Sequence, residues 1–151
     1  MNPRILIILA TLGSAALLLG AFGFQHLGGM APCKLCLWQR WPHAVAIAIG
    51  VLALVLNRVQ LAWIGAIAAL VSANIGLYHT GVEQGWWEGP TTCTSGAIGG
   101  LSADELLSQI MDAPLVRCDD IAWQMAGLSM AGWNMVLSLI LAGLWIAAAR
   151  R

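Results

Sequence analysis

The sequence is most unusual in how little charge it carries. Seven basic and seven acidic residues among 151 cancel to a formal net charge of zero, and only 9% of residues are charged. Soluble domains carry about 25% charged residues, and proteins that bind nucleic acid usually have an excess of basic residues. The composition therefore argues against a soluble domain and against nucleic acid as a partner.

Apolar residues take the place of the missing charge. The chain is 60% hydrophobic, its mean hydropathy is +0.80, and a helix needs about 20 apolar residues to cross a bilayer. The apolar runs predict membrane spans at about 5–24, 37–56, 61–78 and 130–149. We therefore expect an all-α membrane protein, a four-transmembrane-helix bundle forming one domain over residues 1–151, with outer loops at about 25–36 and 79–129.

The first apolar run lacks the features of a cleaved signal peptide, although Arg4 supplies a basic start. No charge interrupts it from Ile5 to Phe24, so it is longer than the apolar region of a signal peptide, which is about 7–15 residues. No A-x-A cleavage site follows it. We expect this segment to be retained as the first span.

The basic residues predict the orientation of the bundle in the membrane. Four lie on one side of the predicted spans, namely Arg4, Arg58, Arg150 and Arg151. Three lie on the other side, namely Lys34, Arg40 and Arg117. By the positive-inside rule the richer side is cytoplasmic. Both termini are then cytoplasmic, and every cysteine faces the outer side, which in a bacterial envelope is oxidising.

The long second outer loop contains a signal for a short helix. Ser102 and Glu105 fit a capping box, and the apolar residues that follow form one face before Pro114 ends the pattern. We predict a short interfacial amphipathic helix in this loop. A helix that only covers the end of the bundle is an equally good interpretation.

Cys33 and Cys36 form a C-x-x-C pair where the second span begins. At the first turn of a helix, unpaired N–H groups and the helix dipole favour a thiolate, and Lys34 and Arg40 add positive charge nearby. A thiolate of low pKa is both a nucleophile and a good leaving group in disulfide exchange. The pair therefore indicates redox chemistry at a membrane surface.

Other uses of this cysteine pair are possible. Haem attachment requires a histidine directly after the second cysteine, and Leu37 stands there. Zinc sites favour a second close pair, whereas Cys93 and Cys118 are far apart in the sequence, so we predict no metal. Disulfides that only connect loops remain an alternative.

Arg40 and His79 are the candidate binding residues for an electron acceptor. Thiols alone cannot be net oxidants, and a lipid-soluble quinone suits this depth. Arg40 lies about one helical turn beyond Cys36, and a charge inside a span costs about 2.5–3.5 kcal/mol, which marks a functional site. Its guanidinium group can donate to a quinone carbonyl, although an arginine reaching towards water is the simpler alternative. His79 ends the third predicted span, where it serves the same pocket or caps the helix.

Together these residues resemble the disulfide bond formation protein B (DsbB) family of bacterial inner-membrane oxidoreductases. The resemblance covers nearly the whole chain: the spans, the C-x-x-C before the second span and the cysteines of the second outer loop. The segment from Cys33 to Arg40 is similar to the family's C-x-x-C followed at four residues by arginine. Tyr78-His79 and the stretch from Gly89 to Cys93 resemble one bacterial branch of the family.

The resemblance implies an enzyme, a protein dithiol:quinone oxidoreductase. It would reoxidise a periplasmic thioredoxin-fold oxidase of the DsbA type and pass electrons to ubiquinone or menaquinone. By position, Cys93 corresponds to the cysteine that forms the mixed disulfide with the partner, and Cys118 to its disulfide mate. Cys33 corresponds to the cysteine that exchanges with Cys118, and Cys36 to the one that contacts quinone.

The same resemblance assigns Arg40 to the quinone site and places His79 near it. Gln39 stands where some members have an acidic residue, so the resemblance gives it no role. Three alternatives remain open: an enzyme like vitamin K epoxide reductase, a structural membrane protein with disulfide-connected loops, and a family variant that serves one dedicated oxidase.

Overall fold

The computed structural model of the protein describes residues 2–90, 102, 104, 107, 111 and 116–151. The long helices are α1 (Pro3–His26), α2 (Lys34–Val55), α3 (Ala62–Glu83) and α5 (Met130–Ala149). The short elements are a 3-10 helix, η1 (Val59–Leu61), and an antiparallel hairpin of β1 (Gln124–Met125) and β2 (Leu128–Ser129). Within the described residues, the 4 long helices, with η1 continuing into α3, are long and apolar enough to cross a membrane. The predicted four-helix membrane bundle is confirmed.

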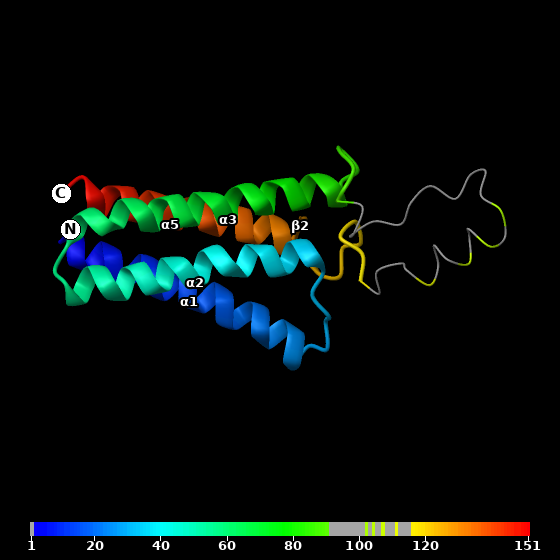
Figure 1. Ribbon diagram of the computed structural model, residues 1–151, viewed down its shortest axis with the longest axis horizontal. Helices are drawn as coiled ribbons and strands as arrows, with labels where there is room; N and C mark the ends of the chain where they lie inside the picture. Colours follow the sequence, from blue (N-terminus) through cyan, green and yellow to red (C-terminus); the bar gives the residue numbers. More distant parts are fainter. Residues whose placement is uncertain (1, 91–101, 103, 105–106, 108–110, 112–115) are drawn as a thin grey trace.

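Helices α2, α3 and α5 run along one axis, and α1 is inclined to them, so that its C-terminal end diverges from the bundle (Figure 1). Helix α3 packs against α2 and α5, and α1 packs against the same two helices from the other side. Both termini and the turn between α2 and α3 lie at one end of the bundle, whereas α2 begins at the opposite end (Figure 1). We call that opposite end the cysteine end, because Cys33 and Cys36 lie there.

Side-chain caps fix where three of the helices begin. Asn2 accepts a hydrogen bond from the backbone N–H of Arg4, and Ser129 accepts one from Gly132. For α2 the capping atom is the sulfur of Cys33, which accepts the backbone N–H of Cys36. A capping side chain satisfies a backbone donor that has no partner within the helix. One cysteine of the C-x-x-C motif is therefore also part of the local structure of α2.

Small residues allow the helices to approach closely. A Cβ atom added to Gly50 of α2 would lie 1.9 Å from Oγ1 of Thr11 on α1. One added to Gly65 of α3 would lie 2.6 Å from the ring of Trp145, which is fully buried on α5. Lipid tails are as apolar as leucine, so helices in a bilayer associate largely through such close packing.

The outer surface of the bundle is apolar, as a lipid-facing surface should be. Large side chains such as Leu12, Leu19, Val55 and Ile67 are at least 60% exposed. In water such a surface would drive association. In a bilayer these side chains face acyl chains, which explains why apolar residues lie on both the inside and the outside of the bundle.

The largest differences from the predicted helix boundaries are at the end of α3 and at the start of α2. Helix α3 continues to Glu83 instead of ending near residue 78, because no strong helix breaker occurs before Gly85, which has a φ of +69°. His79 therefore belongs to a helix and not to the outer loop. Helix α2 begins at Lys34, so the C-x-x-C motif lies across its first turn.

The helix predicted around residues 102–111 falls largely outside the described residues. The exceptions are Ser102, which is not helical, and Asp104, Leu107 and Met111, which are helical. Leu107 and Met111 are strongly exposed. Cys93 also lies outside the described residues.

Candidate functional site

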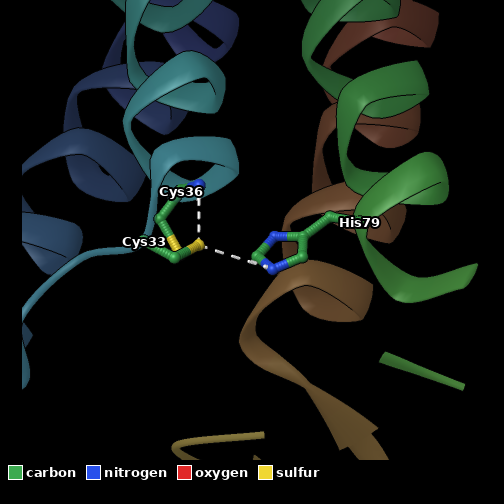
Figure 2. A group of neighbouring side chains, drawn as sticks. All are labelled: Cys33, Cys36 and His79. Carbon is green, nitrogen blue, oxygen red and sulfur yellow. Dashed lines mark hydrogen bonds between the residues drawn. The ribbon is translucent and has the colours of Figure 1, made fainter. Parts of the chain in front are cut away.

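The first turn of α2 brings the two cysteines of the C-x-x-C motif together. Their sulfur atoms lie 2.7 Å apart, with the Cys33 thiol donating to Cys36, and the backbone N–H of Cys36 lies 3.2 Å from the Cys33 sulfur. Figure 2 shows the pair facing His79 on α3. Cys33 is buried and Cys36 is partly exposed.

The pKa of the Cys33 thiol is raised far above its usual range. The main cause is the hydrogen bond with the Cys36 sulfur, followed by burial. A proton shared by the two sulfurs therefore remains on Cys33. When the reduced pair carries one negative charge, that charge lies on Cys36.

His79 approaches the pair from α3, with its Nε2 atom 3.6 Å from the Cys33 sulfur. Its other nitrogen, Nδ1, lies 2.9 Å from Nε2 of Gln39 on α2. The same Gln39 amide nitrogen donates to the Leu35 carbonyl at 3.3 Å, which fixes the orientation of the amide group. Because Gln39 donates to Nδ1, the neutral imidazole carries its proton on Nε2, towards Cys33.

The segment between α3 and α5 returns to the same place through Cys118. This residue is buried in one cluster with Cys33, Leu35 and Val82, and Cys36 packs against the cluster. The His79 ring also contacts the Cys118 backbone. The structure thus brings together three of the predicted cysteines, although they belong to two separate segments of the sequence.

Cys118 is flanked by an ion pair between Arg117 and Asp119. The Arg117 guanidinium holds the pKa of the Asp119 carboxyl below its usual range. Both side chains are partly exposed, so the pair contributes mainly to the local shape of the segment.

A cavity of about 460 Å³ opens beside the cysteines. Its walls are mostly apolar, and all long helices contribute to it. Its polar lining includes Cys33, Cys36, Gln39, Arg40, His43, His79, Glu83 and Asn134. Cysteines, a cation and titratable groups thus converge on one apolar cavity, which is the usual form of a ligand site.

Arg40 is held at the wall of this cavity by α1. Its guanidinium donates to the Gln25 side chain at 2.6 Å and to the Ala21 carbonyl at 3.3 Å, and it lies 4.9 Å from the centre of the Phe22 ring. Its Nε atom is buried and has no hydrogen-bond partner among the residues that the structure describes. The Nε–H group of Arg40 is therefore a donor that none of the described residues accepts.

Glu83 is a cavity residue that the sequence prediction missed. It lies one turn beyond His79 on α3, accepts a hydrogen bond from the Ser129 hydroxyl, and approaches Nε2 of His79 at 3.8 Å. The prediction ended the third span before this residue and so assigned it to a loop. The spacing of four residues from His79 would have revealed the contact if the helix had been extended.

Gln39 and His43 were also missed as members of the site. Both lie on the buried face of α2, and their polar partners lie on α3 and α5. The sequence signal was the polar character of two residues inside an apolar span. Only the tertiary arrangement shows what each one contacts.

Cys33, Cys36 and His79 also have the composition of a metal site. One ligand atom from each lies within 4.8 Å of the others. Thiolate and imidazole groups are the ligands that zinc prefers. The prediction of no metal remains a prediction.

A C-x-x-C cysteine pair at one end of a membrane-spanning bundle, packed against a third cysteine, has the arrangement of a membrane-embedded thiol–disulfide protein. The sequence model of one family, described as disulfide bond formation protein DsbB, matches residues 3–148. The chain belongs to the DsbB family. It is a disulfide-bond-forming protein of the membrane.

Individual relatives agree with this assignment. The chain is 29% identical to disulfide bond formation protein B of Stutzerimonas stutzeri, with 95% of the chain and 94% of the relative covered. It is 30% identical to the protein of the same name from an Acidovorax strain, covering 89% and 82%. An uncharacterized protein of Rickettsia prowazekii is 29% identical, covering 80% and 73%.

Proposed function

We propose that the protein is a dithiol:quinone oxidoreductase. It oxidises a periplasmic thioredoxin-fold thiol oxidase of the DsbA type and delivers the electrons to the membrane quinone pool, as ubiquinone or menaquinone. The observation that carries the proposal is the packing of Cys118 against the Cys33–Cys36 pair at an apolar cavity that Arg40 lines.

The outer disulfide accepts the electrons of the partner. A partner thiolate attacks Cys93 of the Cys93–Cys118 disulfide, and the S–S bond breaks with its electron pair on Cys118. The Cys118 thiolate then attacks Cys33 of the Cys33–Cys36 disulfide. The bond between Cys118 and Cys33 forms, and Cys36 leaves as a thiolate. The second partner thiol attacks the mixed disulfide, which releases the oxidised partner and leaves Cys93 reduced.

The surroundings favour this division of roles between the two inner cysteines. The raised pKa of Cys33 in the reduced pair leaves Cys36 as the thiolate. His79 directs its Nε2 proton towards the Cys33 sulfur, where it stabilises charge during exchange. The sulfur that carries the negative charge in the reduced pair is the better leaving group, so exchange at Cys33 releases Cys36 to the cavity.

The cavity suits a quinone head group. Its volume is within the range of small-molecule sites, its walls are mostly apolar, and Arg40 has a buried donor without a protein partner among the described residues. A bound quinone would be the terminal acceptor of the two electrons. Arg40 would hold it by donating to an oxygen, with Cys36 beside it and His79 and Glu83 as titratable neighbours.

The proposed location is the bacterial inner membrane, with both termini cytoplasmic and the cysteines periplasmic. Support comes from the separation of the termini from the cysteine end along the bundle (Figure 1). The positive-inside rule applied to the terminal arginines gives the direction. In this orientation the cysteines face an oxidising compartment.

Quinone reduction by the purified protein in detergent tests the proposal, with a reduced DsbA-type protein as electron donor. We expect turnover by the wild-type protein and none by Cys36→Ser or Cys93→Ser. Asn74→Ala is a suitable control, because Asn74 bonds only to its own helix among the described residues. A Cys36→Ser variant that reduced quinone at the normal rate would refute the role of Cys36. No turnover by the wild-type protein with any quinone would favour a structural protein.

Zinc binding is the second candidate, because the ligand atoms of Cys33, Cys36 and His79 lie close together. Elemental analysis of protein purified without chelator distinguishes the two functions. Stoichiometric zinc that inhibits disulfide exchange when bound would favour a metal site. Unchanged turnover after treatment with a chelator would favour the redox function.

A further inference from the structure

A second polar cluster lies further along the bundle, at the wall of the cavity. Nε2 of His43 on α2 lies 2.9 Å from the side-chain oxygen of Asn134 on α5 and 3.0 Å from the Ser72 hydroxyl on α3. The Ser138 hydroxyl approaches the same nitrogen at 3.4 Å. Three polar side chains from two helices therefore converge on one nitrogen of His43.

The hydrogen bonds of Asn134 determine which nitrogen of His43 carries the proton. Nδ2 of Asn134 donates to the carbonyl and to the hydroxyl of Ser72, at 3.4 and 3.1 Å. The side-chain oxygen of Asn134 therefore faces His43 and needs a donor. Nε2 of His43 is that donor, so the other nitrogen, Nδ1, is an unprotonated acceptor.

This acceptor is buried and has no partner in the part of the chain that the structure describes. His43 is 3% exposed, and its Nδ1 atom makes no hydrogen bond within the described residues. His43 also lines the cavity beside the cysteines. Buried polar atoms are normally satisfied, so an acceptor without a partner on a residue that lines the cavity indicates a ligand that brings a donor.

His43 lies three residues beyond Arg40, which places the two about 4.5 Å apart along the helix axis. Both line the same cavity. Arg40 offers only donors, and His43 offers an acceptor. The cavity thus has two adjacent polar groups with opposite hydrogen-bonding character.

We propose that Nδ1 of His43 binds a hydroxyl group of the quinol, the reduced product. The inference rests on the proposed quinone reduction. Quinone oxygens only accept hydrogen bonds, whereas the hydroxyl groups that form on two-electron, two-proton reduction also donate. An acceptor at this position stabilises the reduced form and leaves the oxidised form unaffected. The site therefore shifts the equilibrium between bound quinone and bound quinol towards the quinol.

Direct binding measurements test this subsite without turnover. Decylubiquinone and decylubiquinol are bound separately, under anaerobic conditions, to protein carrying Cys36→Ser so that the cysteines exchange no electrons with the ligand. We expect His43→Leu to weaken quinol binding about tenfold, the usual effect of one hydrogen bond. Quinone affinity should stay within about twofold.

The matched control is Ser14→Ala, which removes another buried polar group without a hydrogen-bond partner among the described residues. Ser14 is fully buried on α1 and does not line the cavity. We expect this variant to bind both ligands as the parent protein does. If His43→Leu weakened quinol and quinone equally, the role of Nδ1 in distinguishing them would be overturned.

A spectroscopic measurement on folded protein guards against a variant that fails to fold. With ¹⁵N-labelled histidine, Nδ1 of His43 should resonate as an unprotonated acceptor and should shift on saturation with quinol but not with quinone. The remaining histidines are assigned with His26→Gln and His79→Gln. An Nδ1 resonance that quinol leaves unchanged would overturn the proposal, and would point to a buried water as its donor.

Quinone reduction and the quinol subsite at His43 are distinguished by different outcomes. If the parent protein bound neither ligand, the proposed quinone reduction and the subsite would both be wrong. If it bound both ligands and His43→Leu changed neither affinity, only the subsite would be wrong.

Discussion

At the scale of single residues, Cys33 and Cys36 carry the same side chain in different surroundings. Cys33 is buried, caps α2 and donates to Cys36, and its pKa is raised by that hydrogen bond and by burial. A raised pKa means that the thiol keeps its proton at neutral pH and loses it only in strongly alkaline solution. Cys36 is more exposed and receives the hydrogen bond.

The first prediction concerns the order of alkylation. When fully reduced protein is treated with iodoacetamide at pH 7, we expect Cys36 to be modified before Cys33, because only a thiolate reacts. Peptide mass spectrometry over time gives the order. Raising the pH should accelerate modification of Cys33. Faster modification of Cys33 than of Cys36 at pH 7 would contradict the assignment of the proton.

A second prediction concerns Gln39, which acts through His79. Replacing Gln39 with leucine removes the donor to Nδ1 of His79, so the Nε2 proton is no longer held towards Cys33. We expect disulfide exchange at Cys33 to slow by about tenfold, the effect of losing one hydrogen bond. Acid-quenched samples separated on gels would follow formation of the Cys33–Cys118 disulfide after addition of the reduced partner.

The ¹⁵N spectrum of His79 separates a positioning role of Gln39 from a general structural one. In wild-type protein Nδ1 should be unprotonated, and in Gln39→Leu both tautomers should be populated. If disulfide exchange at Cys33 slowed in Gln39→Leu while the His79 spectrum stayed unchanged, Gln39 would not act through the tautomer of His79.

At the scale of helices, the contact between α3 and α5 depends on the absence of a side chain at Gly65. An added Cβ would overlap the ring of Trp145, a large and fully buried group that cannot move aside easily. We expect Gly65→Ala to lower the free energy of unfolding by about 1–3 kcal/mol, the usual cost of overpacking. Unfolding in mixed detergent micelles measures the effect.

Gly143→Ala is the matched control for this prediction. Gly143 lies on α5 close to Trp145 in sequence, yet no heavy atom of the described residues lies within 4 Å of its added Cβ. We expect no loss of stability from this change. Equal destabilisation by both variants would mean that helix packing at Gly65 is not the cause.

At the scale of helices, the sequence could predict the spans but not every helix end. The four spans were predictable because a bilayer demands long apolar runs, and Met130–Ala149 agrees with its predicted range. The end of α3 was not predictable from polarity, because His79 and Glu83 are polar residues that remain helical. Their partners, Cys33 and Ser129, lie on other segments of the chain.

The polar contacts inside the bundle could not be predicted from the sequence either. The C-x-x-C motif and Arg40 stand out because cysteine pairs and buried charges are rare. His43 and Gln39 gain meaning only from neighbours that other helices bring to them. Local periodicity carries no information about which helix faces which.

At the scale of the whole molecule, the first turn of α2, with Cys33 and Cys36, lies at the opposite end of the bundle from both termini (Figure 1). We predict that, in intact cells treated with a reductant, a membrane-impermeant maleimide will label the native cysteines from outside. In a variant without native cysteines, Arg151→Cys should react only after the membrane is made permeable. Mass shifts on gels give the result, and labelling of Arg151→Cys in intact cells would reverse the orientation.

Finally, the sulfur of Cys33 caps α2 and is also a reactant in the proposed cycle. Every bond that this sulfur makes or breaks during the cycle also changes its strength as a cap, so the stability of the helix terminus and the reduction potential of the disulfide are linked. A difference in capping of about 1.4 kcal/mol between the redox states corresponds to about 30 mV. Changes in the first turn of α2 would therefore tune the driving force of electron transfer without touching a reacting atom.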